Sequence, residues 1–163
     1  MTNQLLARLA RADARLLEPH LEAVDLPVRK QLQARNRRVE RIYFPDSGVA
    51  SVVANGDTPI EVGMIGREGM TGISVLLGDD ERAQHETYMQ VGGKGRCLTA
   101  DRLREAIAKS GALHQVLLRY VQVFLRQTAE TALANGRGKI EERLARWLLM
   151  AHDHQRRRAE THA

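Results

Sequence analysis

Residues 42–78 decide the fold, and they read IYFPDSGVASVVANGDTPIEVGMIGREGMTGISVLLG. Two short segments in this stretch, 49–53 and 60–65, are apolar and rich in β-branched residues. Between them lies Asn55-Gly56-Asp57, and Asn-Gly pairs readily adopt the positive φ angles of a tight hairpin turn. We therefore predict two antiparallel strands joined at this turn.

Four glycines follow at three-residue spacing, namely Gly63, Gly66, Gly69 and Gly72. Glycine loses more backbone freedom on folding than any other residue, so this spacing disfavours both helix and strand. The pattern favours a loop whose backbone turns tightly or comes close to a ligand or to another strand. A tight sheet corner without a ligand explains these residues equally well.

Three motifs of this region are distinctive together: Tyr43-Phe44-Pro45, Ser47-Gly48-Val49 and Gly66-Arg67-Glu68-Gly69-Met70-Thr71-Gly72. With EERLARWLLM at residues 141–150, they resemble one branch of the Crp/Fnr family of bacterial transcription regulators. The resemblance implies an α+β fold, with an antiparallel β-roll (a double-stranded jelly roll of the cyclic-nucleotide-binding type) behind short N-terminal helices. It also implies a long C-terminal dimerisation helix, followed by a helix-turn-helix that binds DNA.

Length and composition agree with one globular domain. The chain has 163 residues, 43% apolar and 28% charged, which is enough for a hydrophobic core. No apolar run approaches the ~20 residues that span a bilayer, and the N-terminus lacks the apolar core of a secretion signal. The single cysteine, Cys97, excludes an internal disulfide and an iron–sulfur cluster and favours a reducing compartment. We expect a cytoplasmic protein without a membrane partner.

The net charge of +5 permits contact with nucleic acid without requiring it. The positive charges gather in two places, around residues 35–41 and at residues 156–158, rather than along one strip. Solvated surface is the simpler interpretation of both clusters.

Short elements surround the predicted hairpin. Leu5, Leu6 and Leu9 share one helical face, and Asp13 is expected to cap a second short helix that Pro19 ends. Further strands are expected within residues 21–43, at 84–91 and from residue 96 onward.

Two turns depart from the family pattern. Regulators of this kind usually place glycines near positions 29 and 36, where this chain has Arg29 and Asn36. Asparagine tolerates left-handed backbone angles, whereas arginine adopts them less easily. Further along, Thr99 is expected to cap a helix over residues 100–109, and Gly111 to end that helix in a left-handed conformation.

The helix expected at residues 113–134 has an apolar arc wider than one packing surface needs. Two surfaces explain the arc: one stripe would cover the β-roll, and the other would pair with the same helix of a second copy. A buried helix in a monomer is the alternative. The residues expected at the homodimer contact are Leu117, Leu118, Tyr120, Val121, Phe124 and Leu125.

We expect three parts: a sensory domain (1–111), a dimerisation helix (112–136), and a hinge with a further helix (137–163). The hinge is expected where residues 135–138 interrupt the helix. Thr161-His162 resembles the start of the helix-turn-helix in this family branch. DNA contact is therefore expected only through a domain that this chain does not include.

By resemblance, the ligand pocket runs from residue 69 to residue 83. Cyclic-nucleotide pockets hold the phosphate with backbone N–H groups and an arginine, and the ribose hydroxyl with a carboxylate. Here Met70 replaces the expected glutamate, and the loop before Arg82 is longer than usual, so conventional cyclic AMP binding is disfavoured and the effector stays open. The candidate ligand-binding residues are Gly69, Met70, Thr71, Gly72, Arg82 and Ala83.

The sequence offers little for catalysis. His152 and His154 are two residues apart, so on a helix they point to different sides and make poor joint metal ligands. We find no nucleophile–base pair or phosphate-binding loop motif, and expect neither an enzyme nor a metal site. The favoured function is the sensory and dimerisation part of a Crp/Fnr-like regulator. The alternatives are a stand-alone cyclic-nucleotide-binding module that regulates a protein partner, a cupin-type enzyme, and an effector-free dimerisation scaffold.

Overall fold

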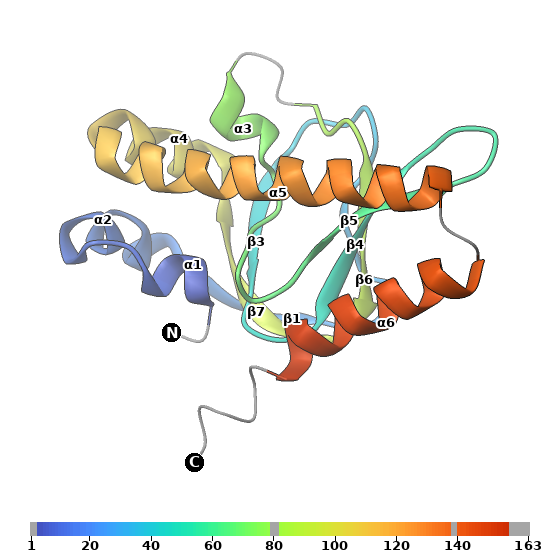
Figure 1. Cartoon of the computed structure of the whole chain (residues 1–163). Coiled ribbons are helices and arrows are strands. Elements are labelled where there is room, and N and C mark those ends of the chain that lie inside the picture. Colours follow the sequence, from blue (N-terminus) through green and yellow to red (C-terminus); the bar gives the residue numbers. More distant parts are fainter. Residues whose placement is uncertain (1–2, 79–81, 138–139, 157–163) are drawn as a thin grey trace.

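The structure, a computed structural model, describes residues 3–78, 82–137 and 140–156 (Figure 1). Short helices α1 (Gln4–Ala7) and α2 (Arg11–Leu17) and the 3-10 turn η1 (Glu18–His20) come first, followed by seven strands and further helices. The strands are β1 (Glu22–Leu26), β2 (Gln31–Gln33), β3 (Arg41–Pro45), β4 (Val49–Ala54), β5 (Ile60–Ile65), β6 (Glu86–Val91) and β7 (Gly93–Thr99). The remaining helices are α3 (Ser74–Leu77), α4 (Ala100–Lys109), α5 (Gly111–Arg137) and α6 (Ile140–Arg156).

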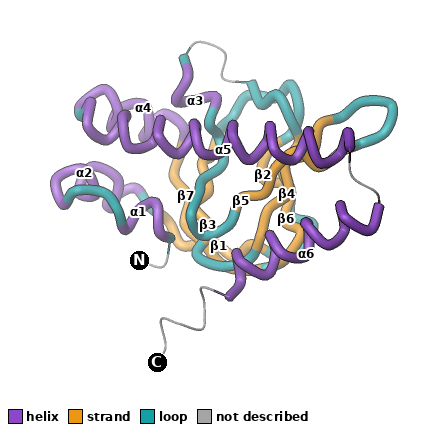
Figure 2. The backbone as a smooth tube through the Cα atoms, viewed as in Figure 1, coloured by secondary structure: helices purple, strands orange, loops and turns teal. Residues whose placement is uncertain are grey.

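The strands form two antiparallel sheets, with the orders β1-β7-β3 and β2-β6-β4-β5. Figure 2 shows α5 passing across these strands. The predicted hairpin is β4–β5, but the tight Asn-Gly turn is wrong, because neither Asn55 nor Gly56 has a positive φ. The last strand pair is Ala54 with Ile60, since Pro59 has no N–H to donate to the ladder. The strands are therefore joined by a longer loop.

The core lies between the sheets and the helices that cover them. Ile42 and Phe44 of β3, Leu103 of α4, and Leu113 and Leu117 of α5 are all completely buried and belong to one hydrophobic cluster. Each such side chain contributes about 1.5–3 kcal/mol when it leaves water. Because α5 supplies part of this cluster, the long helix is an integral part of the β-roll domain.

The two turns that lack the expected glycines keep the glycine-like geometry. Arg29 has a φ of 69° and Asn36 a φ of 59°. Each residue is anchored through its backbone, since Arg29 N donates to Met89 O at 2.7 Å and Asn36 N donates to Ala83 O at 2.8 Å. These bonds hold angles that cost an L-residue roughly 1–2 kcal/mol, so the arginine is accommodated.

The predicted helix ends are partly confirmed. Thr99 Oγ1 accepts a hydrogen bond from Arg102 N, so the cap of α4 is confirmed. The prediction that Asp13 caps a helix is wrong: it lies inside α2, buried, where its Oδ1 accepts from Ser110 Oγ at 2.6 Å. Gly111 is not left-handed either, because Ser110 ends α4 in an extended conformation and caps α5 by accepting from Leu113 N at 3.1 Å.

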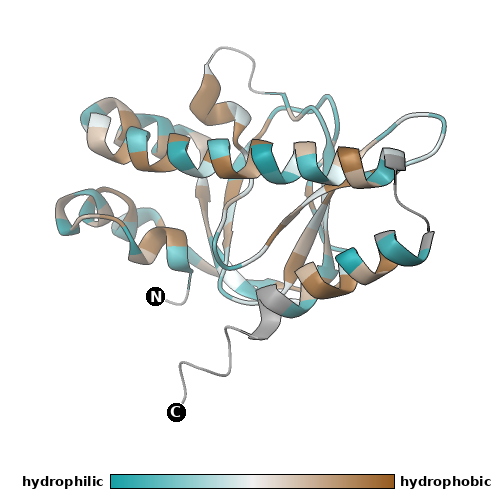
Figure 3. Cartoon of the chain, viewed as in Figure 1, coloured by the Kyte–Doolittle hydropathy of each residue, from teal (hydrophilic) through white to brown (hydrophobic). Residues whose placement is uncertain are grey.

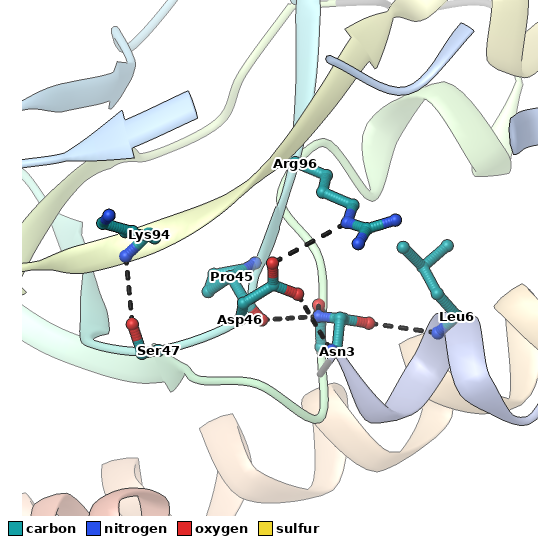
Figure 4. A network of polar contacts seen from close by, with 8 residues as sticks. Asn3, Leu6, Pro45, Asp46, Ser47, Lys94 and Arg96 are labelled. Carbon is teal, nitrogen blue, oxygen red and sulfur yellow. Dashed lines mark hydrogen bonds and ion pairs between the residues drawn. The ribbon is translucent and has the colours of Figure 1, made fainter. Parts of the chain in front are cut away.

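Asn3 connects the N-terminus to the sheet and to residues 66–72, which we call the glycine loop (Figure 4). Its Oδ1 caps α1 by accepting from Leu6 N at 3.0 Å. Its Nδ2 donates to Pro45 O at 2.8 Å and to Gly69 O at 3.0 Å, and its backbone N donates to Asp46 Oδ1 at 2.9 Å. This one buried side chain therefore holds the end of β3 and the glycine loop together.

Helix α5 crosses the β-roll (Figure 1), and α6 turns back so that both helices contact β5, where Asn135 Nδ2 of α5 and Trp147 Nε1 of α6 donate to Glu61. The expected break at residues 135–137 is wrong, since α5 continues through Arg137. The expected turn at residues 79–81, Gly138 and the tail from residue 157 lie outside the described residues. Within the described ranges, no helix is both long enough and apolar enough to cross a membrane.

We predict that Asn3→Ala lowers the free energy of unfolding by about 2–3 kcal/mol, because it removes a helix cap and leaves two buried carbonyls unpaired. Thr99→Ala is the control, since it removes only the exposed cap of α4 and should cost about 1 kcal/mol. Urea unfolding followed by circular dichroism measures both values. Equal losses in the two variants would contradict the proposed role of Asn3.

Candidate functional site

The side chain of Tyr120 packs against the backbone of the glycine loop. A Cβ atom added at Gly69 would lie 2.5 Å from Tyr120 Oη and 2.7 Å from its Cζ. Tyr120 Oη donates a hydrogen bond to Met70 O at 3.1 Å. Burial raises the pKa of Tyr120 well above its usual value, so the phenol stays neutral and the bond persists at physiological pH. Glycine at position 69 is therefore explained by helix docking.

The next aromatic residue of α5, Phe124, packs against Gly63. A Cβ at Gly63 would lie 2.9 Å from Phe124 Cζ. One turn further along α5, Gln127 Oε1 accepts from Met64 N at 2.9 Å. Helix α5 thus lies against the backbone of β5 as well as against the loop that follows it.

The end of the glycine loop is joined to β3. Thr71 N donates to Tyr43 O at 2.9 Å, and Tyr43 N donates to Thr71 Oγ1 at 2.9 Å. Gly72 has a φ of +77°, and a Cβ there would overlap Ile42 Cδ1. The polar groups of Thr71 are therefore used inside the chain, where a cyclic-nucleotide pocket would need donors directed at phosphate.

A cavity of about 270 Å³ lies next to this loop, between the β-roll and α5. Of the six candidate ligand residues, Met70, Gly72 and Ala83 line it, whereas Gly69, Thr71 and Arg82 do not. The Arg82 side chain lies on an exposed surface, where its Nη1 donates to Asn36 O at 2.8 Å. The structure therefore separates the expected arginine from the expected pocket.

Neutral side chains line this cavity throughout its described part. No Lys, Arg, Asp or Glu is among the described lining residues, and the polar groups are amides, hydroxyls and one histidine. Gln33 of β2 was not singled out by the sequence, because an isolated glutamine carries no motif. The lining residues are Gln33, Val52, Val62, Ile65, Met70, Gly72, Ile73, Ser74, Leu77, Ala83, Gln84, His85, Thr87, Phe124, Leu125 and Thr128.

Fewer apolar residues lie on the outer face of α5 than the sequence predicted. Of the six residues expected at a dimer contact, four are buried in the core of their own chain: Leu117, Tyr120, Val121 and Phe124. Leu118 is partly buried, and the side chain of Leu125 is 57% exposed. Figure 3 shows hydrophobic and hydrophilic stretches alternating along α5. Of the six residues, Leu118 and Leu125 remain accessible on the outer face, while the other four hold the helix on the β-roll.

Glu61 of β5 joins α6 to the sheet. Its Oε2 accepts from Ser51 Oγ at 2.6 Å and from Trp147 Nε1 at 3.2 Å, and its backbone O accepts from Asn135 Nδ2 at 3.4 Å. A groove of about 390 Å³ lies between the hairpin, α5 and α6 at this point. The sequence contains one indication of this contact: Glu61 is the only charged residue in the apolar segment 60–65. Its partner, Trp147, lies 86 residues further along the chain.

His114 and two arginines of the basic cluster near residue 37 contact groups of their own chain. No group of three metal-binding side chains occurs within the described ranges. His114 Nε2 lies 2.9 Å from Leu76 O, which ties α5 to α3. Arg35 Nη1 donates to Asn55 O, and Arg41 Nη1 pairs with Glu22 Oε2 at 3.2 Å, so these arginines bind groups of their own chain.

Comparison with solved structures establishes the fold. A protein described as a transcriptional regulator of the Crp/Fnr family from Eubacterium rectale matches with a TM-score of 0.75 at 11% identity, over 93% of this chain and 72% of its own. The c-di-GMP-responsive global regulator CLP of Xanthomonas campestris matches with a TM-score of 0.69 at 15% identity, over 85% of this chain and 70% of its own.

A third match comes from another class of protein. The regulatory subunit of a cAMP-independent protein kinase A from Trypanosoma brucei has a TM-score of 0.62 at 16% identity, over 74% of this chain and 43% of its own. No family model and no curated protein sequence matches the chain. The expected α+β fold, an antiparallel β-roll of the cyclic-nucleotide-binding type with a long C-terminal helix, is confirmed.

We predict that Gly69→Ala destabilises the protein by about 1–3 kcal/mol, because the added methyl group displaces the buried, hydrogen-bonded ring of Tyr120. Gly111→Ala is the matched control, since nothing lies within 4 Å of a Cβ at the start of α5. That change should be neutral or stabilise by up to about 1 kcal/mol. Thermal unfolding measures both, and a Gly69→Ala variant as stable as the control would contradict the docking role.

The contact at Glu61 generates a second prediction. Trp147→Phe keeps an aromatic ring but removes the N–H donor to Glu61, so amide hydrogen exchange within α6 should accelerate about threefold to tenfold. Leu149→Ala changes an exposed α6 residue and should leave exchange near the wild-type rate. Unchanged exchange in Trp147→Phe would mean that this bond does not hold α6.

Proposed function

We propose that this chain is the effector-sensing and dimerisation part of a Crp/Fnr-like transcription regulator. The motifs at residues 43–49, 66–72 and 141–150 and the fold shared with two regulators support this function. The observation that carries it is the division of α5 into two faces. One face packs on the β-roll of its own chain, and the other is exposed along the length of the helix.

The exposed face has the spacing of a coiled coil. Six positions separated alternately by four and three residues form what we call the α5 seam, and this spacing suits a pair of helices. Its first half consists of Leu118, Gln122 and Leu125 and its second half of small residues, so two copies of the helix can approach closely along the second half. The seam consists of Leu118, Gln122, Leu125, Ala129, Ala132 and Gly136.

The proposed mechanism is a shift between two arrangements of α5. Phe124, Leu125 and Thr128 of α5 line the cavity, so a bound molecule touches the helix directly. Leu125 also belongs to the seam, which places one side chain between the effector and the dimer contact. Any change in α5 would reach α6 through Glu61 and Trp147, and then the DNA-binding part that follows in such a regulator.

The proposed protein is a non-catalytic, cytoplasmic regulator without a metal centre, and it does not bind cyclic AMP in the usual way. An exposed Arg82 that contacts Asn36 and a cavity without described cationic side chains both support a different effector. DNA contact is assigned to a helix-turn-helix beyond these residues rather than to α5 or α6.

A stand-alone module that regulates a protein partner is the second candidate. The likeness to a kinase regulatory subunit favours it, as do three exposed leucines on α6, namely Leu144, Leu148 and Leu149. In this case α6 would contact the partner protein, and the α5 seam would remain unpaired.

The oligomeric state tests the first candidate. We expect the wild-type chain to sediment as a dimer at micromolar concentration and Leu125→Glu to sediment as a monomer, since a charge would be buried in the seam without a partner. Val123→Glu is the matched control, because Val123 is also exposed on α5 (52%) but lies off the seam. It should remain a dimer. A monomeric wild-type chain, or a dimer that survives Leu125→Glu, would contradict the dimerisation role and favour the second candidate.

A further inference from the structure

The cavity beneath α5 has a chemical character of its own. We infer that it binds a small, uncharged and largely apolar molecule that presents one hydrogen-bond acceptor, such as a ketone, ester or amide, to the side chain of Gln33. This inference rests on the proposed sensing function and names the class of its effector. It concerns the described lining residues alone.

The walls of the cavity favour an apolar body. Val52, Ile65, Met70 and Phe124 are buried residues that line it, and they come from both the β-roll and α5. The volume of about 270 Å³ lies near the lower end of small-molecule pockets, which hold roughly 300–1,000 Å³. A compact molecule that moves apolar surface out of water would bind here through the hydrophobic effect.

The side-chain amide of Gln33 determines which polar group of a ligand the cavity favours. Its Nε2 is buried and has no hydrogen-bond partner among the residues that the structure describes, whereas its Oε1 accepts from Thr87 Oγ1 at 3.4 Å. A Cβ at Gly72 would lie 3.6 Å from this Nε2, so the amide lies beside Gly72, which also lines the cavity. A buried donor without a partner is costly, and a ligand acceptor would relieve that cost. The cavity therefore prefers a ligand that carries an acceptor.

A phosphate does not fit this lining. An anion moved out of water needs a fixed positive charge or several directed donors, and no arginine or lysine is among the described lining residues. The nearby Thr71 directs its N–H to Tyr43 O. The fold is shared with cyclic-nucleotide-binding domains, but the chemistry of the lining is that of a neutral pocket.

Two probes with the same number of heavy atoms test the inference on the full chain. Acetophenone carries a carbonyl acceptor, and cumene replaces that carbonyl with a methyl-bearing carbon. Each is titrated into ¹⁵N-labelled protein, and amide shifts at Met70, Thr87 and Phe124 report binding in the cavity. Cyclic AMP is titrated in the same way.

Gln33→Met removes the donor while preserving the length of the side chain. Gln31→Met is the matched control, since Gln31 lies on the same strand but is exposed and bonded to Glu86 Oε1. We expect Gln33→Met to weaken acetophenone about threefold to tenfold and to leave cumene within about twofold. Gln31→Met should change neither affinity. Val62→Phe, which fills the cavity, should abolish binding of both probes.

Three results would overturn the inference. They are the absence of saturable shifts with both probes, an acetophenone affinity that Gln33→Met leaves unchanged, and tighter cavity binding of cyclic AMP than of acetophenone. Sedimentation separates this failure from failure of the proposed function. A dimer without probe binding refutes the ligand class alone, whereas a monomer that binds acetophenone in a Gln33-dependent way supports the ligand class and refutes the dimer.

Discussion

The rest of the structure depends on the contact between the Tyr120 ring and the backbone of Gly69 and Met70. The ring reaches the loop only because position 69 has no side chain, and its hydroxyl then satisfies Met70 O. This contact sets the distance between α5 and the β-roll. The same loop holds the N-terminus, since Gly69 O accepts a hydrogen bond from the buried side chain of Asn3. One close approach thus orders the glycine loop, the long helix and α1.

Docking one face of α5 has two consequences for the other parts of the molecule. The docked face closes a neutral cavity with Phe124, Leu125 and Thr128, and the exposed face presents the α5 seam. Leu125 belongs to both surfaces, so in the proposed mechanism a single side chain links the cavity to the seam. At the far end of the same helix, Asn135 of α5 and Trp147 of α6 both donate to Glu61, so both helices are joined to the β4–β5 hairpin.

A shared fold does not by itself imply a shared ligand. Relatives with TM-scores of 0.62–0.75 but only 11–16% identity keep the path of the backbone, which depends on strand pairing and a buried core. Ligand recognition depends on a few side chains, and here Arg82 is turned toward Asn36 while Gln33 lies in the cavity wall. Three of the four glycines, which suggest a phosphate cradle in a sequence, are accounted for by other contacts: Gly63 by Phe124, Gly69 by Tyr120 and Gly72 by Ile42.

The sequence by itself determined the strands of the hairpin, the cap at Thr99, the long amphipathic helix and the β-roll class, because these follow from local periodicity, capping chemistry and distinctive motifs. It also placed left-handed turns near residues 29 and 36. Only the tertiary structure decided that Tyr120 and Phe124 face inward, that Asp13 binds Ser110, that Glu61 meets Trp147, and that Gln33 lines the cavity while Arg82 does not. These contacts join residues up to 97 positions apart, and local sequence patterns carry no information about which distant groups packing brings together.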